Sequence, residues 1–227
     1  MKLNSNRTDD FGYLHVEDVY SDQELQYIWN EISHIDYVMD VSFSKEDKEN
    51  YSKTHNAVYD GEYMMSGFGI GLDGFYARRD YSAILNLNIK IMSDVVCQAM
   101  MTTHPANFCY DLVNQDFTLL NKYVPGQKYK RHNDISSFSA VTFFSRDEIE
   151  GGEFEFSDYD IKFECKNNSC VIFPSWVYHN TMDINEGIRY SMAQFMVLQC
   201  SAPVHRDSVG KRPDGRDLLS DASSRYK

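Results

Sequence analysis

The sequence has few cysteines and prolines, with five of each in 227 residues. The cysteines are scattered and include no Cys-x-x-Cys pair, which excludes a zinc knuckle or a dithiol redox motif and favours reduced, unpaired thiols. They are Cys97, Cys109, Cys165, Cys170 and Cys200. Residues 1–10 lack the apolar core of a secretory signal, and no window approaches the run of about 18 apolar residues that a membrane span requires. We therefore expect a protein of the cytoplasm that does not insert into membranes.

Long runs of Lys and Arg are also absent, and the formal net charge is −12. A negative protein repels phosphate backbones and anionic lipid surfaces unless a local basic patch offsets its charge. The two basic clusters, Arg78-Arg79 and Lys128-Tyr129-Lys130-Arg131, are short and are typical of solvated surface charge. We expect no nucleic-acid partner and no membrane-surface partner.

Aromatic residues, in contrast, are abundant, with 16 Tyr and 14 Phe, and hydrophobic residues make up 42% of the chain. Such a composition builds a packed, β-rich interior in a chain long enough for one domain. Helical spacing of apolar residues predicts a helix over residues 22–33, where Ser21 and Glu24 form a capping box, and a longer helix over residues 81–101. The glycine-rich segment 42–80 predicts long loops that could form a lid.

After Pro105 the texture changes to short β-branched and aromatic runs separated by turn formers, which predicts antiparallel strands. We expect strands at residues 108–113, 117–123, 138–144, 154–156, 161–165, 169–173 and 188–199. Helices followed by strands indicate an α+β fold, in which a mostly antiparallel sandwich or small barrel is backed on one sheet by N-terminal helices. We interpret residues 1–227 as a single domain, with support at 1–104, a β-core at 105–200 and a polar tail at 201–227.

The most specific pattern is His132-Asn133-Asp134, followed far downstream by His179. Side chains alternate across an extended backbone, so His132 and Asp134 can point the same way while Asn133 points away. Two imidazoles and one carboxylate on one face of an octahedral metal leave three positions open, as in non-haem Fe(II) oxygenases. A 2-oxo acid can take two of these positions and O₂ the third.

Arg189 lies ten residues after His179 and begins an apolar strand. A guanidinium inside a sandwich can bind a carboxylate with two parallel hydrogen bonds. Ser191, on the same face of that strand, and Tyr123 and Tyr129, which flank the Pro125-Gly126 turn, offer further hydroxyl donors. These residues form a candidate site for 2-oxoglutarate.

These motifs together resemble the prolyl 4-hydroxylase-like family of Fe(II)/2-oxoglutarate dioxygenases. The resemblance spans about Asp116 to Leu198 and rests on five segments in the family's order. They are the stretch Tyr123-Val124-Pro125-Gly126-Gln127-Lys128-Tyr129-Lys130-Arg131-His132-Asn133-Asp134, then Gly151-Gly152-Glu153-Phe154, Val171-Ile172-Phe173-Pro174, His179, and Gly187-Ile188-Arg189-Tyr190-Ser191.

The resemblance implies a double-stranded β-helix (jelly-roll) core, His132, Asp134 and His179 as iron ligands, Arg189 as the 2-oxoglutarate anchor and Tyr123 as a donor to the co-substrate. It implies hydroxylation of a prolyl or other peptidyl side chain with release of succinate and CO₂, with O₂ as co-substrate and ascorbate as a candidate additional cofactor. Many relatives carry Lys where Arg189 stands. Some carry a tyrosine where this chain has Phe143 and Phe144.

Several alternatives stay open at this stage. The substrate could be a free amino acid or another small molecule instead of a peptide or protein. From a different class, the chain could be a catalytically inactive, metal-free β-sandwich that binds a partner, or a zinc or manganese enzyme of the cupin type. A nucleic-acid demethylase is less favoured, because residues 190–198 lack the second arginine of that branch. The oligomeric state stays open as well.

Overall fold

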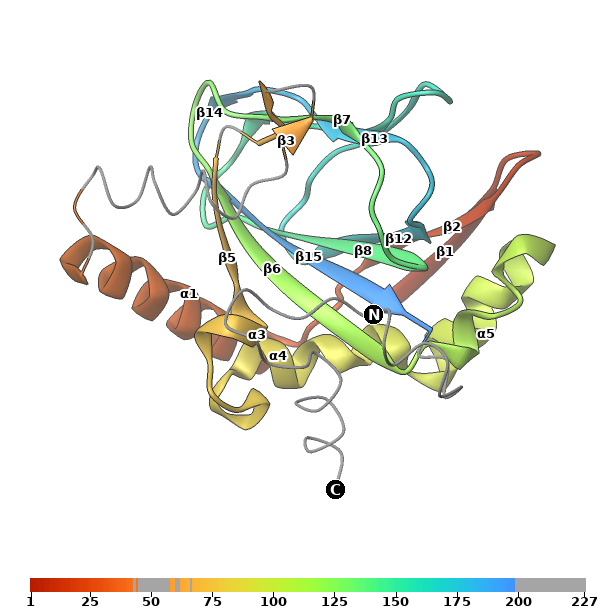
Figure 1. Ribbon diagram of the computed structural model, residues 1–227, viewed down its shortest axis with the longest axis horizontal. Helices are drawn as coiled ribbons and strands as arrows, with labels where there is room; N and C mark the ends of the chain where they lie inside the picture. Colours follow the sequence, from red (N-terminus) through yellow and green to blue (C-terminus); the bar gives the residue numbers. More distant parts are fainter. Residues whose placement is uncertain (43, 45–57, 60–61, 66, 199–227) are drawn as a thin grey trace.

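A large β-sheet, a smaller β-sheet facing it and a layer of helices behind the large sheet make up the fold (Figure 1). The computed structural model describes residues 1–42, 44, 58–59, 62–65 and 67–198. The helices are α1 (Asp22–Ser42), α3 (Leu72–Phe75), α4 (Ala83–Leu87) and α5 (Asp94–Thr103), with 3-10 turns η1 (Arg79–Tyr81), η2 (Asn88–Met92), η3 (Pro105–Asn107) and η4 (Tyr110–Leu112).

The large sheet has seven strands in the order β1-β2-β12-β8-β15-β6-β5, and each neighbouring pair is antiparallel. Its strands are β1 (Lys2–Arg7), β2 (Gly12–Glu17), β5 (Phe68–Gly71), β6 (Gln115–Tyr123), β8 (Phe138–Phe144), β12 (Ser169–Pro174) and β15 (Arg189–Val197). Strands distant in sequence therefore lie side by side, which is characteristic of a jelly roll.

The small sheet has four strands in the order β11-β10-β13-β7, again antiparallel. These are β7 (Tyr129–His132), β10 (Phe154–Phe156), β11 (Ile161–Phe163) and β13 (His179–Thr181). Two short ladders, β9 (Glu150–Gly151) with β14 (Ile184–Glu186) and β3 (Val58–Tyr59) with β4 (Glu62–Tyr63), complete the described strands. The predicted α+β jelly-roll class is confirmed.

Strand β8 shows how alternation divides the interior into two cores. All seven of its residues are buried. Phe138, Ala140 and Phe144 pack with the helices in one cluster, whereas Val141 and Phe143 pack with aromatic residues of the small sheet in another. The sequence of a strand that is buried on both faces lacks the alternation of polar and apolar residues and is mostly apolar. The second core, between the sheets, adjoins the candidate site described below.

Helix α1 begins as predicted and ends later than predicted. The Ser21 amide donates to the Glu24 carboxylate at 2.8 Å and the Glu24 amide donates to Ser21 Oγ at 3.4 Å, which forms the expected capping box. The helix continues to Ser42 instead of Ser33. Its last turns are fixed to the large sheet because Asp36 binds the Lys122 ammonium at 2.7 Å and accepts from the Tyr190 hydroxyl.

The single helix predicted over residues 81–101 is wrong. The segment breaks into α4, η2 and α5, because Ser82 caps α4 by accepting from the Leu85 amide at 2.9 Å, and Asn88 turns into the core to donate to Thr118 at 2.6 Å. The strand predicted over 108–113 is also wrong. There the 3-10 turn η4 buries Tyr110, whose hydroxyl donates to the Ile91 carbonyl at 2.8 Å.

Strands β1 and β2 were not predicted, because the polar residues of β1 show no apolar alternation. The other predicted strands are present, with ends that shift by a few residues. Residues 43, 45–57, 60–61 and 66 of the predicted lid at 42–80 lie outside the described residues, and so does the whole of the predicted tail at 201–227. Both therefore stay predictions. Within the part of the chain that is described, no helix is long and apolar enough to cross a membrane. The single-domain interpretation stays a prediction.

A buried polar network joins the helical layer to the edge of the large sheet. Arg79 binds both oxygens of Asp116 at 2.9 Å, and Asp116 also accepts from Asn88 at 3.2 Å and from Gln194 at 2.8 Å. The side chain of Asp116 is 1% exposed. A buried carboxylate needs such partners because an unpaired buried charge is costly.

We expect Arg79→Met to lower the free energy of unfolding by about 3 kcal/mol, because Asp116 would then stay buried without its cation. Urea unfolding followed by circular dichroism measures this change. The matched control is Arg78→Met, since Arg78 pairs with Asp80 in solvent and its loss should leave the unfolding midpoint unchanged. Equal midpoints for the two variants would contradict this account of the network.

Candidate metal centre and neighbouring anion site

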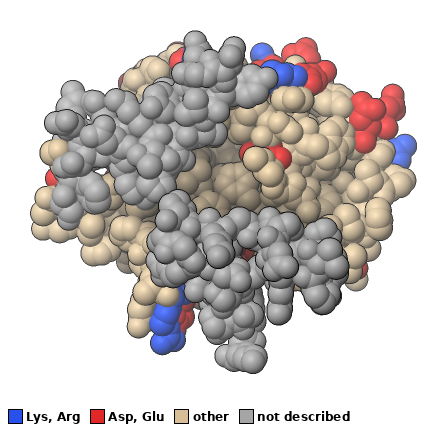
Figure 2. Space-filling view, in the orientation of Figure 1, with Lys and Arg blue, Asp and Glu red and all other residues tan. Residues whose placement is uncertain are grey.

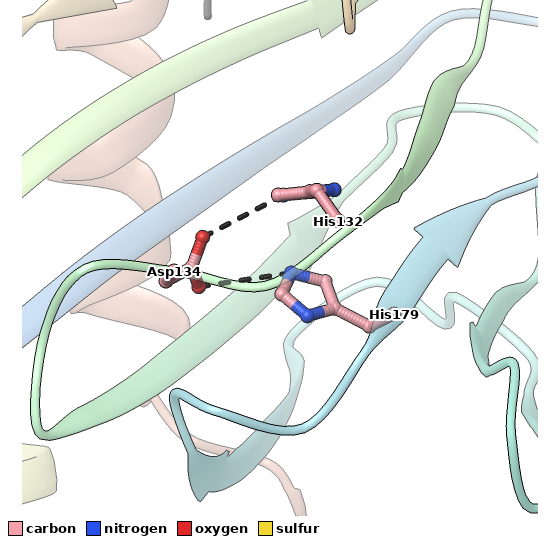
Figure 3. A group of neighbouring side chains, drawn as sticks. All are labelled: His132, Asp134 and His179. Carbon is pink, nitrogen blue, oxygen red and sulfur yellow. Dashed lines mark ion pairs between the residues drawn. The ribbon is translucent and has the colours of Figure 1, made fainter. Parts of the chain in front are cut away.

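The pairing of β7 with β13 brings the two sequence-predicted histidines together. His132 and His179 are direct partners across this antiparallel pair, and their ring centroids lie 4.2 Å apart. Asp134 follows β7, where its amide donates to the Ser175 carbonyl at 2.9 Å. Both imidazoles point toward the Asp134 carboxylate (Figure 3).

The three side chains form a compact set of ligand atoms. His132 Nε2 lies 3.5 Å from Asp134 Oδ1, and His179 Nε2 lies 3.6 Å from Asp134 Oδ2. One ligand atom from each residue lies within 4.8 Å of the others. This spacing and a donor set of two imidazoles and one carboxylate suit a divalent transition metal with open positions.

Hydrogen bonds to the backbone fix both histidine tautomers. Nδ1 of His132 lies 2.7 Å from the Lys130 carbonyl, and Nδ1 of His179 lies 3.0 Å from the Val177 carbonyl. Because a carbonyl only accepts, each Nδ1 carries the hydrogen and each Nε2 presents a lone pair to Asp134 and to a metal. Burial lowers the pKa of each histidine to about 4, so both are neutral ligands at pH 7.

Asp134 has a partner that sequence reasoning missed. Ser139, on β8, donates its hydroxyl to Asp134 Oδ2 at 2.5 Å. Burial raises the pKa of the Asp134 carboxyl, whereas His132 and the Ser139 hydrogen bond act in the opposite direction. Ser139 lies in a strand that is mostly apolar and aromatic, and a single serine there carries no sequence signal of this contact.

Arg189 begins β15 and is fully buried. Its Nη1 donates to the Gly152 carbonyl and lies 3.4 Å from Cys165 Sγ. Gly152 has φ +73°, and a Cβ there would lie 2.2 Å from Ile184 and 3.0 Å from Arg189 Nη1. Glycine is therefore required, both for the backbone conformation and for the approach of the guanidinium. The Tyr123 ring faces the guanidinium at 4.7 Å.

The guanidinium has an unoccupied hydrogen-bonding edge. Nε and Nη2 of Arg189 are buried without a partner, and no acidic side chain among the described residues lies within ion-pair distance. Cys165 does not supply the missing charge, because burial raises the pKa of its thiol to about 11. Nε and Nη2 form the edge that binds both oxygens of a carboxylate. A buried cation with a free edge of this kind fits an anionic ligand.

Hydroxyl groups connect this anion site to the metal centre. The Tyr123 phenol interacts with the hydroxyls of Ser191 and Thr181, and burial raises its pKa to about 12. Thr181 lies two residues after His179 on β13 and accepts from the Tyr129 amide at 2.9 Å. The Tyr129 ring stacks on His132 with centroids 4.0 Å apart, and burial raises the Tyr129 pKa as well.

The other predicted site features can also be located. A β-bulge between β7 and β13 separates the pairs His179–His132 and Thr181–Tyr129 and allows Tyr129 and His132 to lie on the same side. Phe143 faces Arg189, with 5.9 Å between the guanidinium and the ring, whereas Phe144 packs on the helix side. Neither phenylalanine offers the hydroxyl that a tyrosine would. Thr181 instead supplies a hydroxyl beside Tyr123, which the sequence did not reveal. Asn121, opposite Ser191 in the sheet, is a second missed residue, with its Oδ1 buried and unpartnered.

The fold and the site together define a double-stranded β-helix protein with a facial His-Asp-His set. Residues 118–197 match the model of the 2OG-Fe(II) oxygenase superfamily. The structure is similar to a prolyl-4-hydroxylase from Pseudomonas putida, with a TM-score of 0.57 and 14% identity, covering 84% of this chain and 94% of that chain.

It is also similar to a prolyl hydroxylase from Trichoplax adhaerens, solved with a peptide fragment of the hypoxia inducible factor oxygen degradation domain. That similarity has a TM-score of 0.56 and 10% identity, and covers 82% of this chain and 83% of the other. A search of curated protein sequences found no match. At these identities the structural similarity shows a shared fold. The family match is confined to residues 118–197, and together with the His132, Asp134 and His179 set it supports a dioxygenase of the class that uses Fe(II), 2-oxoglutarate and O₂.

The depressed histidine pKa values make metal-free stability depend on pH. The pKa of His179 is about 4 in the folded state against an ordinary value of 6.5. The unfolded chain therefore binds a proton first as the pH falls, and stability is lost between about pH 6.5 and pH 4.

We expect the metal-free protein to lose more stability between pH 7 and pH 5 than the His179→Gln variant, by about 1–2 kcal/mol. Chelator-treated samples unfolded in urea at both pH values measure this difference. His34→Gln is the control, because His34 lies on an exposed turn of α1 and should not change the pH dependence. Parallel pH curves for wild type and His179→Gln would contradict a buried, neutral His179.

Proposed function

We propose that His132, Asp134 and His179 bind the Fe(II), and that the free edge of Arg189 binds the distal carboxylate of 2-oxoglutarate. The observation that carries this proposal is the buried guanidinium, because a protein seldom buries a cation without a counter-charge. A dicarboxylate supplies that charge when it binds. The metal set alone would also suit other enzymes, including the cupin-type alternative, but those have no need for this anion site.

The residues around the two sites have separable tasks in this proposal. The two neutral imidazoles and Asp134 hold the metal on one face, and the backbone carbonyls at Nδ1 keep the imidazoles in position. Arg189 orients the co-substrate, with Tyr123 and Ser191 as hydroxyl partners. Tyr129 covers one face of His132 and helps to exclude water from it. When bound, Fe(II) couples the oxidative decarboxylation of 2-oxoglutarate to hydroxylation of the substrate.

The substrate in this proposal is a peptidyl side chain, and prolyl is the first choice. Support comes from the shared fold with two prolyl hydroxylases, one of them solved with a peptide. Figure 2 shows a hollow near the centre of this face, where the described residues carry mostly no charge, with acidic atoms at one place on its rim. A mostly uncharged lining suits a neutral side chain such as proline better than a charged metabolite.

The direct experiment incubates the protein with Fe(II), 2-oxoglutarate, ascorbate and O₂, together with proline-containing peptides. We expect succinate to form and the peptide to gain the mass of one oxygen. His132→Ala should abolish both signals. If succinate forms but only free amino acids gain oxygen, the small-molecule alternative replaces the peptide proposal. If no condition yields succinate, the assignment of these residues to oxygenase chemistry fails.

Arg189→Met provides a second prediction. We expect it to raise the Kd for 2-oxoglutarate on the order of 100-fold, because truncating one partner of a buried charge pair costs about 3 kcal/mol. The melting temperature of the ligand-free protein should stay equal or rise, because the buried cation without a counter-ion is removed. Thermal shift assays with and without 2-oxoglutarate measure both quantities. A variant that 2-oxoglutarate stabilises as strongly as the wild type would contradict the anchor role.

A further inference from the structure

Three serines form a hydrogen-bonded chain behind Asp134, which we call the serine chain. It consists of Ser139 on β8, Ser175 between β12 and β13, and Ser136 in the loop before β8. Ser139 is 1% exposed and Ser175 is fully buried. The oxygens of Ser139 and Ser175 are 2.8 Å apart, and those of Ser175 and Ser136 are 2.5 Å apart.

The hydrogen atoms of this chain can all point the same way. An ionised carboxylate only accepts, so the Ser139 hydroxyl donates to Asp134 Oδ2. The Ser139 oxygen can then accept from Ser175, and the Ser175 oxygen from Ser136. The Ser136 hydrogen then points to Ser175 at 2.5 Å in preference to the Phe138 carbonyl, its other acceptor, at 3.2 Å. A chain of hydroxyls that donate in one direction is strengthened by mutual polarisation. The last acceptor of the serine chain is a single oxygen of Asp134, Oδ2.

Loop anchoring does not require these hydroxyls, because the backbone already fixes the loop. The Asp134 amide donates to the Ser175 carbonyl at 2.9 Å, and the Ser175 amide donates to the Ser137 carbonyl at 3.2 Å. The Ser137 amide donates to the Met196 carbonyl at 2.9 Å. The side-chain hydroxyls are additional to these bonds, and what they determine is the state of the Asp134 carboxylate.

We propose that Ser139, supported by Ser175, is a positioning residue that keeps Asp134 a one-oxygen ligand, an inference that rests on the proposed function. Both oxygens of Asp134 lie near an imidazole, with Oδ1 3.5 Å from His132 Nε2 and Oδ2 3.6 Å from His179 Nε2. Oδ2, however, accepts from the Ser139 hydroxyl, which makes Oδ1 the oxygen offered to the metal. Three ligands with one atom each leave three positions on an octahedral metal, enough for a chelating 2-oxo acid and O₂. A carboxylate bound through both oxygens would leave two, and the co-substrate would fill them.

The test uses Mn(II) as the probe, because it prefers the same class of oxygen and nitrogen ligands as Fe(II) and is stable in air. Relaxation of bulk-water protons reports how many exchangeable waters the bound Mn(II) retains, and titration gives its Kd. In Ser139→Ala we expect about one-third less relaxation enhancement, since three bound waters become two. We also expect a Kd raised on the order of 10-fold, as is usual when a partner of a metal ligand is lost.

Three further variants sharpen the result. Ser139→Thr keeps the hydroxyl, so its relaxation enhancement and Kd should be close to those of the wild type. If Ser139 only fills space, Ser139→Thr should perturb both values as much as Ser139→Ala does. Ser175→Ala should cause a smaller change in the same direction. Ser169→Ala is the matched control, because Ser169 is equally buried but donates to the Lys166 carbonyl at 2.7 Å and should change neither value.

Each outcome decides the inference. If Ser139→Ala shows the same relaxation enhancement and the same Kd for Mn(II) as the wild type, the role of Ser139 is overturned, while the assignment of the metal site still stands. Equal loss in Ser139→Ala and Ser139→Thr also overturns the role of Ser139, because packing would then explain the effect. A wild-type protein that binds no Mn(II) or Fe(II) overturns the proposed function and this inference together. If Ser139→Ala fails to fold, Ser175→Ala is tested instead. A relaxation enhancement and a Kd equal to those of the wild type in Ser175→Ala would then contradict a role for the serine chain.

Discussion

Arg189 carries its charge at a fully buried position, and no acidic side chain within the described ranges lies within ion-pair distance. The protein satisfies only Nη1, through Gly152 and Cys165, and surrounds the group with the rings of Tyr123 and Phe143. Such a charge lowers the stability of the empty protein unless a ligand compensates it. In the proposed function, this loss of folding stability is offset when an anionic co-substrate binds.

The position of this charge relative to the metal centre depends on two adjacent strand pairs. The pairing of β15 with β6 places Arg189 opposite Tyr123, and the pairing of β13 with β7 places His179 opposite His132. The Tyr123 phenol and Thr181 connect the two pairs across the space between the sheets. A shift of one residue in either register would reverse the faces of these side chains. The aromatic core beside the site thus also maintains the register on which the chemistry depends.

The parts predictable from sequence were those with a local signature. The cluster of His132, Asp134 and His179, the buried position of Arg189 and the strands of the β-core carry their own spacing or alternation, and the capping box marks the start of α1. What sequence did not reveal depends on contacts between distant segments. Asn88 bonds Thr118 across 30 positions and interrupts the expected long helix. Ser139 and Thr181 gain their roles only when β8 and β13 approach the ligand set, since a lone serine or threonine in a strand has no distinguishing pattern.

In the proposed function, 2-oxoglutarate contacts the metal ligated by His132, Asp134 and His179 and the free edge of Arg189 at the same time. Anaerobic titration of the Fe(II)-loaded protein with 2-oxoglutarate, followed by visible absorption, tests it most directly. We expect a charge-transfer band that appears only with both components and saturates at one 2-oxoglutarate per chain. Absence of the band at saturating Fe(II) and 2-oxoglutarate, or an identical band in Arg189→Met at the same low co-substrate concentration, would contradict it.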